Sequence, residues 1–514
     1  HSDLRRQRQM CIRDRLPKAE IDKLTKGTVQ PWEANDLLRL VDRYSHYINE
    51  FPSHLSIHAS GILISEKPIN YFSPTFMPPK GYPTVHFDMH LAEDVRLFKF
   101  DILSQRGLGK IKDALVMIKA NGENQAEIDI HDMRLLKRDE RIKKMLREAN
   151  AIGCFYVESP AMRMLLRKLE VDDYLGLVAA SSVIRPGVAQ SGMMQAYIQR
   201  SRKPEKRAEA HPVLLDLMPE TYGVMVYQED VIKVAYHFAG LSLGEADKMR
   251  RGMSGKYRSR DEFDAVRQKF FDNCINEKGH SKELTAEVWR QTASFAGYAF
   301  AKGHSASYAV ESYQSLYLKA YYPLEYMVAT INNYGGFYRT ELYVHEAKLH
   351  GGEIQPPCVN QSTYQTRLAE NKIFLGFHLL HSFDVKTAVL IEKERTACGP
   401  FISFNDFLDR LSISLEQISI LIRVNAFQFT GVDKRTLLWE AHFKLQKTPS
   451  KFSETVLRDL FKIERPEYQI PQLDNSWQED AFDQMELLGF PLYSPFQLIV
   501  CLLYTSPSPR DRSL

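Results

Sequence analysis

A change in hydrophobic pattern near residue 105 constrains the fold of this chain more than any other feature. Before it, from His54 to about Leu103, the apolar runs Gly61–Ser65 and Val95–Ile102 are short, rich in β-branched and aromatic residues, and flanked by Pro and Gly turns. After it, from residue 107 to about residue 331, apolar residues recur at helical spacing. This order predicts a small β-sheet followed by a large helical region, a mostly helical α+β fold.

Local signals predict where several elements begin and end. Ser242 and Glu245 have the spacing of a capping box, which opens a helix that runs toward Gly252. Ser305 is expected to cap a long helix that ends near Pro323. The remaining patterns predict a helical segment over 16–50, short strands over 350–380, helices over 385–430 and a polar linker over 446–480.

Length and composition exclude several classes of protein. A chain of 514 residues has room for about two to four domains. With 44% hydrophobic and 25% charged residues it is not largely disordered. We find no secretory signal and no apolar run near the roughly 20 residues that span a bilayer. The 6 cysteines are scattered without a C-x-x-C motif, which favours reduced thiols in a cytosol over disulfides or a zinc site.

The two ends of the chain share a possible DNA origin. If an AGA or AGG codon encodes Arg15, one DNA sequence read in its two orientations can encode both Met10–Asp14 and Cys501–Thr505, as a sequencing adapter would. We therefore expect residues 1–15 and 501–514 to be non-native tails. These tails carry net charges of +3 and +1, so the formal net charge of the rest falls from +3 to −1.

With so little net charge, any contact with nucleic acid must come from local basic clusters. The sequence has two such clusters, and the second contains Gly252 and Gly255, which would let the backbone approach a phosphate. Neither this stretch nor Gly107-x-Gly109-Lys110 has Walker A spacing. The alternative for both clusters is an ordinary solvated helix face. The first contains Arg200, Arg202, Lys203, Lys206 and Arg207, and the second Lys248, Arg250, Arg251, Lys256, Arg258 and Arg260.

Lys99 and Asp101 are two residues apart in a predicted strand, so their side chains should share a face. A carboxylate beside a cation at a strand end could ligate Mg²⁺ near a phosphate. The alternative is a solvent-facing ion pair on an edge strand, and this stretch alone favours the alternative.

Three weaker candidates have equally plain alternatives. The Pro-Gly turn after Arg185 could present its guanidinium, or be a surface turn. Lys302 and His304, just before a predicted helix N-terminus, suit an anion site, or His304 is incidental to a capped helix. His54 and His58 could bind a metal if helical, but a structural role is favoured because no third ligand is apparent.

The order of the motifs is more specific than any one of them. Together they resemble the alpha subunit of bacterial DNA polymerase III, the C-family DNA polymerases, over about residues 16–500. The motifs are HLSIHASGILI, LFKFDIL, CFYVESPAMR, IRPGVAQSGM, TYGVMVYQEDV, SLGEADKMRRGM, FAGYAFAKGHSASYA and YQSLYLKAYYPLEYM.

The resemblance implies template-directed nucleotidyl transfer, in which three palm carboxylates hold two Mg²⁺ ions. Asp101 matches the third carboxylate. The other two belong to an upstream Asp-x-Asp strand that is absent here, as is the N-terminal PHP domain, so residues 1–514 alone are expected to be inactive. The resemblance places Lys99, Arg185, Arg250, Arg251, Lys302 and His304 near the incoming nucleotide or template phosphate, and Arg200, Arg202, Lys203, Lys256 and Arg258 near DNA.

The resemblance also divides the chain into regions. Between the two tails, it implies the end of a thumb over 16–53, the second part of the palm over 54–105, fingers over 106–350, a helix-hairpin-helix-like region over 351–435, and a linker with the start of the next domain over 436–500. The hairpin stretch Gly376–Val385 lacks the glycine-rich hairpin that the family often shows.

The implied partners are primer–template DNA and deoxynucleoside triphosphates in the bacterial cytoplasm, at the nucleoid. The sliding clamp and other replisome subunits are candidates, although residues 16–500 contain no glutamine-led clamp-binding motif. The stretches Cys154–Pro160, Ile184–Gly187 and 335–360 are also similar to the error-prone, translesion branch, which leaves replication and repair open. Two other hypotheses are a non-catalytic scaffold paralogue that binds DNA or replisome proteins, and an unrelated helical phosphate-binding enzyme.

Overall fold

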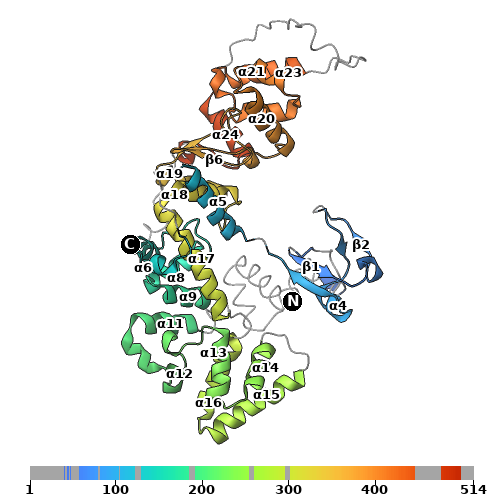
Figure 1. Cartoon of the computed structure of the whole chain (residues 1–514). Helices are drawn as coiled ribbons and strands as arrows, with labels where there is room; N and C mark the ends of the chain where they lie inside the picture. Colours follow the sequence, from blue (N-terminus) through green and yellow to red (C-terminus); the bar gives the residue numbers. More distant parts are fainter. Residues whose placement is uncertain are drawn as a thin grey trace. The chain divides into compact units, whose positions relative to one another are not determined.

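The computed structural model describes residues 40, 43–45, 47, 57–58, 60–78, 81–103, 105–121, 129–184, 192–253, 260–295, 301–445 and 476–498. The chain forms two compact units, residues 1–104 and 105–514, which are drawn together in Figure 1 and described separately below. The first unit is built on short strands, and the second is mostly helical with one small sheet, which confirms the predicted fold class. No described helix is both long and apolar enough to cross a membrane.

The first unit is built on two antiparallel strand pairs. Strand β1 (Gly61–Ile64) pairs with β4 (Phe98–Asp101), in a register that places Leu63 opposite Lys99 and Gly61 opposite Asp101. Both strands lie within the predicted apolar runs. The second pair joins β2 (Thr75–Phe76) to β3 (Thr84–Val85), and the connections contain η1 (Ile69–Tyr71) and α4 (Met89–Asp94), which Asp88 caps.

One face of the β1–β4 pair is apolar and exposed. Ile62 lies opposite Phe100 and Ile64 opposite Phe98. Their exposed fractions are 49%, 51%, 53% and 65% in that order. Because side chains alternate along a strand, Leu63 and Lys99 lie on the opposite face and are less exposed. A contiguous apolar face of this kind is typical of a surface that another element covers.

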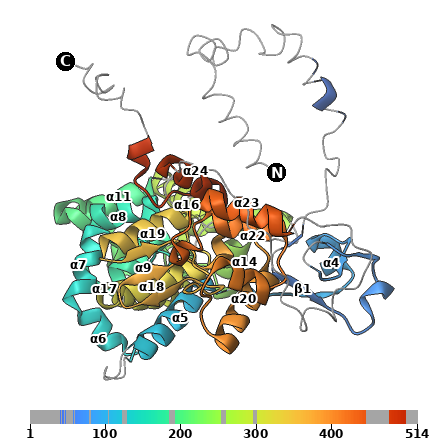
Figure 2. The same ribbon diagram turned by 90° about the horizontal axis from the view of Figure 1, so that it is seen from above.

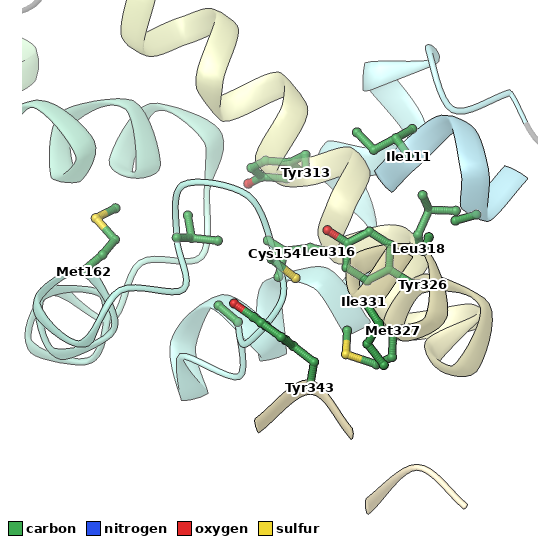
Figure 3. Packing of buried hydrophobic residues seen from close by; sticks show 14 of the residues in the cluster. Ile111, Cys154, Met162, Tyr313, Leu316, Leu318, Tyr326, Met327, Ile331 and Tyr343 are labelled. Carbon is green, nitrogen blue, oxygen red and sulfur yellow. The ribbon is translucent and has the colours of Figure 1, made fainter. Parts of the chain in front are cut away.

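In the second unit the long helix α17 (Lys302–Tyr321) packs against α5 (Arg106–Asn121), α7 (Glu140–Glu148), α9 (Tyr174–Val183) and α18 (Pro323–Asn332) (Figure 2). Tyr313, Leu316 and Tyr326 are fully buried at the centre of its core (Figure 3). The helices from residue 106 to 349 are α5 (Arg106–Asn121), α6 (Met133–Arg138), α7 (Glu140–Glu148), α8 (Pro160–Leu169), α9 (Tyr174–Val183), α11 (Met193–Arg202), α12 (Pro212–Leu217), α13 (Gln228–Lys233), α14 (Leu243–Met253), α15 (Arg260–Asp272), α16 (Lys282–Phe295), α17, α18 (Pro323–Asn332) and α19 (Thr340–Leu349).

Shorter elements and a three-stranded sheet complete the second unit. Parallel strands β5 (Glu353–Gln355) and β7 (Lys372–Phe374) pair, and β6 (Arg367–Ala369) is antiparallel to β7, as expected for short strands over 350–380. The later helices are η6 (Phe377–Leu379), α20 (Val385–Cys398), α21 (Phe404–Arg410), α22 (Leu415–Arg423), η7 (Gln428–Thr430), α23 (Lys434–Leu445), α24 (Trp477–Leu487) and η8 (Pro495–Leu498). Four short helices come earlier in this unit. Two are 3₁₀ helices, η2 (Pro204–Glu209) and η3 (Pro219–Thr221), and two are π-helices, η4 (Val234–Phe238) and η5 (Asn273–Glu277).

The predicted helix boundaries have mixed outcomes. The capping box is confirmed, since the Ser242 hydroxyl accepts from the Glu245 amide at 3.3 Å and the Glu245 carboxylate accepts from the Ser242 amide at 2.9 Å. The cap at Ser305 is wrong, because α17 already begins at Lys302 and the Ser305 hydroxyl is buried against Ser182, 2.6 Å away. The helix does end at Tyr321, before Pro323.

Two other segment predictions are only partly covered. The predicted helix over 16–50 lies outside the described residues, except for residues 40, 43–45 and 47, which are helical. The predicted linker over 446–480 is wrong at its end, where residues 477–480 form the first turn of α24, and residues 446–475 lie outside the described part. The described cysteines, Cys154, Cys274, Cys358 and Cys398, are free thiols.

A buried acid lies at the contact between α17 and α5. Glu311 is only 7% exposed, and its Oε1 atom has no hydrogen-bond partner among the described residues. Gly107 makes room for it, since a Cβ there would come within 1.9 Å of that oxygen. Burial raises the pKa of Glu311 to about 7, and the neighbouring cation Lys110 partly opposes this rise.

We expect the stability of the second unit to fall as pH rises from about 4.5 to about 7, because the folded state holds a proton on Glu311 that the unfolded chain releases. Glu311→Gln should remove this slope and add about 3 kcal/mol at pH 8 but less than about 1 kcal/mol at pH 5. Urea unfolding at the two pH values measures the difference. An equal effect of the substitution at both pH values would contradict the assignment.

Candidate functional site

The candidate group of the first unit is an ion pair on β4. Lys99 Nζ donates to both Asp101 oxygens, at 2.7 and 2.8 Å, so the two side chains share a face as predicted. Gly61, opposite Asp101, leaves room for this reach, because a Cβ there would lie 3.2 Å from Lys99 Cε. His58 Nδ1 accepts from the Gly61 amide at 2.7 Å and lies 3.9 Å from Asp101 Oδ1. His58 thus has the structural role favoured from the sequence, and His54 lies outside the described residues.

This pair keeps Asp101 in the form that binds metals. The hydrogen bond from Lys99 holds the pKa of the Asp101 carboxyl below its usual range. Its side chain is 48% exposed, and an ionised, accessible carboxylate is the oxygen ligand that hard divalent cations prefer. The described residues contain no group of three His, Cys, Asp or Glu side chains that could hold a metal ion. Asp101 therefore fits as one metal ligand, and the described residues do not supply the other ligands of a metal site.

The second unit has its own candidate groups, and the first of them is a pair of arginines on α14. Arg250 donates to Asp247 Oδ1 through Nε at 3.0 Å and Nη2 at 2.8 Å, and through Nη1 to Gln228 Oε1 at 3.2 Å. Arg251 Nε lies 3.0 Å from the other Asp247 oxygen. One carboxylate thus brings together two of the predicted nucleotide-binding residues and fixes the direction of both guanidinium groups.

The other candidate group of the second unit is the first turn of α17. Lys302 and His304 lie inside this turn, so their predicted place before the helix is wrong. The physical reason is a cap from elsewhere, since the Lys302 amide donates to both Glu229 oxygens, at 3.1 and 3.0 Å. Lys302 Nζ forms an ion pair with Glu220 and lies 5.5 Å from the Tyr227 ring centre. The His304 ring packs 4.3 Å from that of Tyr308.

A polar cavity of about 320 Å³ adjoins this turn. Lys233 and Lys302 bring positive charge to its wall, and Asp216 and Glu220 bring negative charge. The Asp230 carboxylate is buried there and accepts from the amides of Val226 and Tyr227, at 2.9 and 2.8 Å. The TYGVMVYQEDV stretch is therefore a buried loop and the start of helix α13, with a polar rim.

Two of the three predicted DNA-binding residues that the structure describes bind acceptors within the protein. Arg200 Nη1 donates to the Tyr222 carbonyl at 3.1 Å, and Arg202 Nη2 donates to Glu170 Oε1 at 2.6 Å. Lys203 is exposed between α11 and η2. Arg185, Lys256 and Arg258 lie outside the described residues.

The sequence analysis missed the carboxylates that position these cations. Asp247 precedes Arg250 by three residues and Arg251 by four, and helical spacing alone could have identified this pair of contacts. Glu229 and Glu220 are 73 and 82 residues from Lys302, so no local signal pointed to them.

Three family models match successive parts of the chain. Residues 7–104 match the bacterial DNA polymerase III alpha NTPase domain, a match that begins inside the proposed N-terminal tail. Residues 107–278 match the bacterial DNA polymerase III alpha subunit finger domain. Residues 351–437 match a helix-hairpin-helix motif. The first two matches meet where the structure divides into its two units.

Curated relatives extend the likeness over most of the chain. DNA polymerase III subunit alpha of Aquifex aeolicus is 31% identical over 75% of this chain and 33% of its own length. Error-prone DNA polymerase of Corynebacterium glutamicum is 31% identical over 88% of this chain and 41% of its own length. DNA polymerase III subunit alpha of Staphylococcus epidermidis is 30% identical over 87% and 41%. The chain thus spans a third to two-fifths of the length of these relatives, and it belongs to the C-family of DNA polymerases, which includes the alpha subunits of bacterial DNA polymerase III and the error-prone DNA polymerases.

Proposed function

We propose that this chain forms part of a DNA-directed DNA polymerase that extends a primer on a template by nucleotidyl transfer. The observation that carries the proposal is the Lys99–Asp101 pair, because it puts an ionised carboxylate beside a cation within the first polymerase match. In such an enzyme a divalent cation, Mg²⁺ in this proposal, polarises the transferred phosphoryl group and the attacking primer oxygen. Asp101 contributes one oxygen ligand toward that cation.

The cationic side chains of the chain take the other roles. Lys99 holds Asp101 ionised and would offer its ammonium group to the triphosphate. Arg250 and Arg251 bind phosphate oxygens of the incoming nucleotide, since Asp247 already fixes their guanidinium groups. Arg185, Lys302 and His304 are assigned to nucleotide or template phosphate, and Lys203, Lys256 and Arg258 to the DNA backbone. Arg200 and Arg202, which bind acceptors within the protein as Arg250 and Arg251 do, are also assigned to the DNA backbone.

The exposed apolar face of the β1–β4 pair supports the proposed domain assignment. In this assignment residues 54–105 are the second part of a palm, and an upstream palm segment covers Ile62, Ile64, Phe98 and Phe100. Residues 16–53 end a thumb, 106–350 are fingers, 351–435 are the helix-hairpin-helix-like region and 436–500 lead into the next domain. The proposal also assigns residues 1–15 and 501–514 as non-native tails. It places the protein in the bacterial cytoplasm.

The experiment that tests this function compares two proteins. A protein of these 514 residues should bind primer–template DNA in preference to blunt duplex but should not extend it, because Asp101 lacks partner carboxylates among the described residues. The longer product of the source gene should extend the primer with Mg²⁺. Extension by the 514-residue protein that disappears in Asp101→Asn would contradict the proposed division of the metal site. Absence of primer–template binding by both proteins would contradict the function itself.

Arg250→Ala is expected to weaken nucleotide binding by the longer gene product about tenfold or more, because it removes charge-assisted hydrogen bonds to phosphate. The measurement is nucleotide titration of the enzyme–DNA complex. Arg290→Ala is a matched control, since Arg290 also pairs with an acid three residues earlier, Glu287, at 2.7 Å. Equal nucleotide affinity in the two variants would count against the role of Arg250.

A further inference from the structure

The helix-hairpin-helix-like region presents two connections that could approach a phosphate backbone. The first hairpin, Leu380–Asp384, joins η6 to α20, and the second, Val424–Asp433, joins α22 to α23. Backbone amides at such turns, with nearby Lys and Arg side chains, are groups that hold DNA phosphates in position. In this chain, amides of the first hairpin and basic side chains beside the second already have acceptors within the protein.

The amides of the first hairpin donate to the protein itself. The His381 amide donates to the Leu487 carbonyl at the end of α24, at 2.8 Å. The Asp384 amide donates to Gln417 Oε1 at 2.7 Å, while Gln417 Nε2 donates to the Ser382 carbonyl at 2.9 Å. Ser382 has a φ of 59°, a left-handed conformation that favours glycine. The hairpin therefore keeps a tight turn without the glycines, and two of its donors are occupied.

The basic side chains beside the second hairpin are neutralised by one helix. Arg423 lies 2.7 Å from an Asp483 oxygen and also contacts Glu486. Lys434 lies 2.6 Å from Asp480 and 2.7 Å from Asp483. Arg435 forms an ion pair with Glu479. All four acids belong to α24, which packs against α22 (Figure 2).

The acceptors that α24 supplies to the region lie along one side of this helix. The acids of α24 fall at positions 479, 480, 483 and 486, which is one face of a helix. This face supplies carboxylates to three cations, and the end of the same helix supplies a carbonyl to the first hairpin. A single segment thus supplies acceptors to groups at both hairpins. Arg423 and Arg435 keep side-chain exposures of 29% and 31%, so they remain at the surface.

We propose that α24 occupies, within the same chain, the phosphate-binding surface formed by Arg423, Lys434, Arg435 and the His381 amide, and that duplex DNA binds this surface only when α24 moves away. The inference rests on the proposed function, since it takes duplex DNA as the competing ligand. Its chemical basis is competition between four carboxylates and the phosphate groups for the same donors. Binding of DNA to this surface is therefore expected to be weak until the acids of α24 are neutralised or displaced.

The test measures the affinity of the 514-residue protein for a fluorescent duplex over a range of salt concentrations. Asp483→Asn with Glu486→Gln should raise the affinity about tenfold at low salt and steepen the salt dependence by about 0.9 for each additional phosphate that the protein neutralises. Glu416→Gln with Glu341→Gln is the matched control, because it removes two exposed acids that form none of the ion pairs described above. The single variant Glu486→Gln, whose side chain is 66% exposed, gives a smaller increase if the double variant fails to fold.

Hydrogen exchange of the unmodified protein provides a second measurement. Saturating duplex should speed exchange in residues 477–487 and leave α17 unchanged, because α24 must leave its place on α22. If wild type binds duplex and the acid variants bind no better than the control, or if α24 stays protected, the inference is wrong while the proposed function stands. If no variant binds duplex or primer–template DNA, the proposed function fails and the inference falls with it.

Discussion

Asp101→Asn is expected to abolish primer extension by the longer gene product. The amide keeps the size of the carboxyl group but loses the charge that attracts a divalent cation, and metal ions supply several kcal/mol of transition-state stabilisation. A loss of about 4 kcal/mol corresponds to a rate roughly 10³-fold lower. The measurement is the single-turnover rate of nucleotide incorporation at saturating Mg²⁺ and nucleotide.

A second variant separates the site from general damage to the first unit. Asp94→Asn removes an exposed acid from helix α4 of the same unit and should leave the rate unchanged. Affinity for primer–template DNA should be equal in both variants, because Asp101 acts on chemistry and not on DNA contact. A rate for Asp101→Asn within a few-fold of wild type would remove Asp101 from the metal site.

Lys319→Met is expected to destabilise the second unit by about 3–5 kcal/mol, because it leaves the Glu346 carboxylate buried without its cation. Lys319 Nζ lies 2.7 Å from Glu346 Oε1, and both side chains are almost fully buried. The same ammonium group donates to Asn150 Oδ1 at 3.1 Å and to the Ile152 carbonyl at 2.9 Å. These contacts join α17, α19 and the loop before α8, so their loss should weaken the centre of the unit. Hydrogen exchange of peptides from α17 and α19 measures the change.

Two further variants show whether the buried charge is the cause. Lys143→Met breaks an exposed pair with Glu140 and should cost less than about 1 kcal/mol. Lys319→Met combined with Glu346→Leu removes both charges and should recover much of the loss. An equally large loss in the double variant would assign the effect to packing around Lys319.

The sequence predicted those features that depend on neighbouring residues. The alternation of a strand placed Lys99 and Asp101 on one face, and the contact between them confirms it. The Ser242 capping box is also confirmed, because both of its partners lie within one turn. The strands at 61–64 and 98–101 and the helical region after residue 105 follow the hydrophobic pattern for the same local reason.

The features that sequence reasoning missed depend on residues far apart in the chain. Glu229 caps α17 from 73 residues away. Local pattern alone therefore predicts the wrong cap, the nearby Ser305. The sequence places Arg202 in a basic cluster, but its guanidinium group binds Glu170, 32 residues earlier in the chain. The ion pairs between α24 and the second hairpin likewise join segments about 50 residues apart. A local charge pattern cannot show which cations a distant acid already neutralises.

Long-read sequencing of the source locus across both ends of this sequence tests the central claim most directly. The claim is that Asp101 belongs to a polymerase metal site completed by carboxylates on another strand. It predicts that the reading frame upstream encodes a strand with Asp-x-Asp, and that the codons for residues 1–15 and 501–514 are replaced by native sequence. A gene that begins near Leu16, or an upstream palm without those two carboxylates, would contradict catalysis by this protein and favour a scaffold that binds DNA.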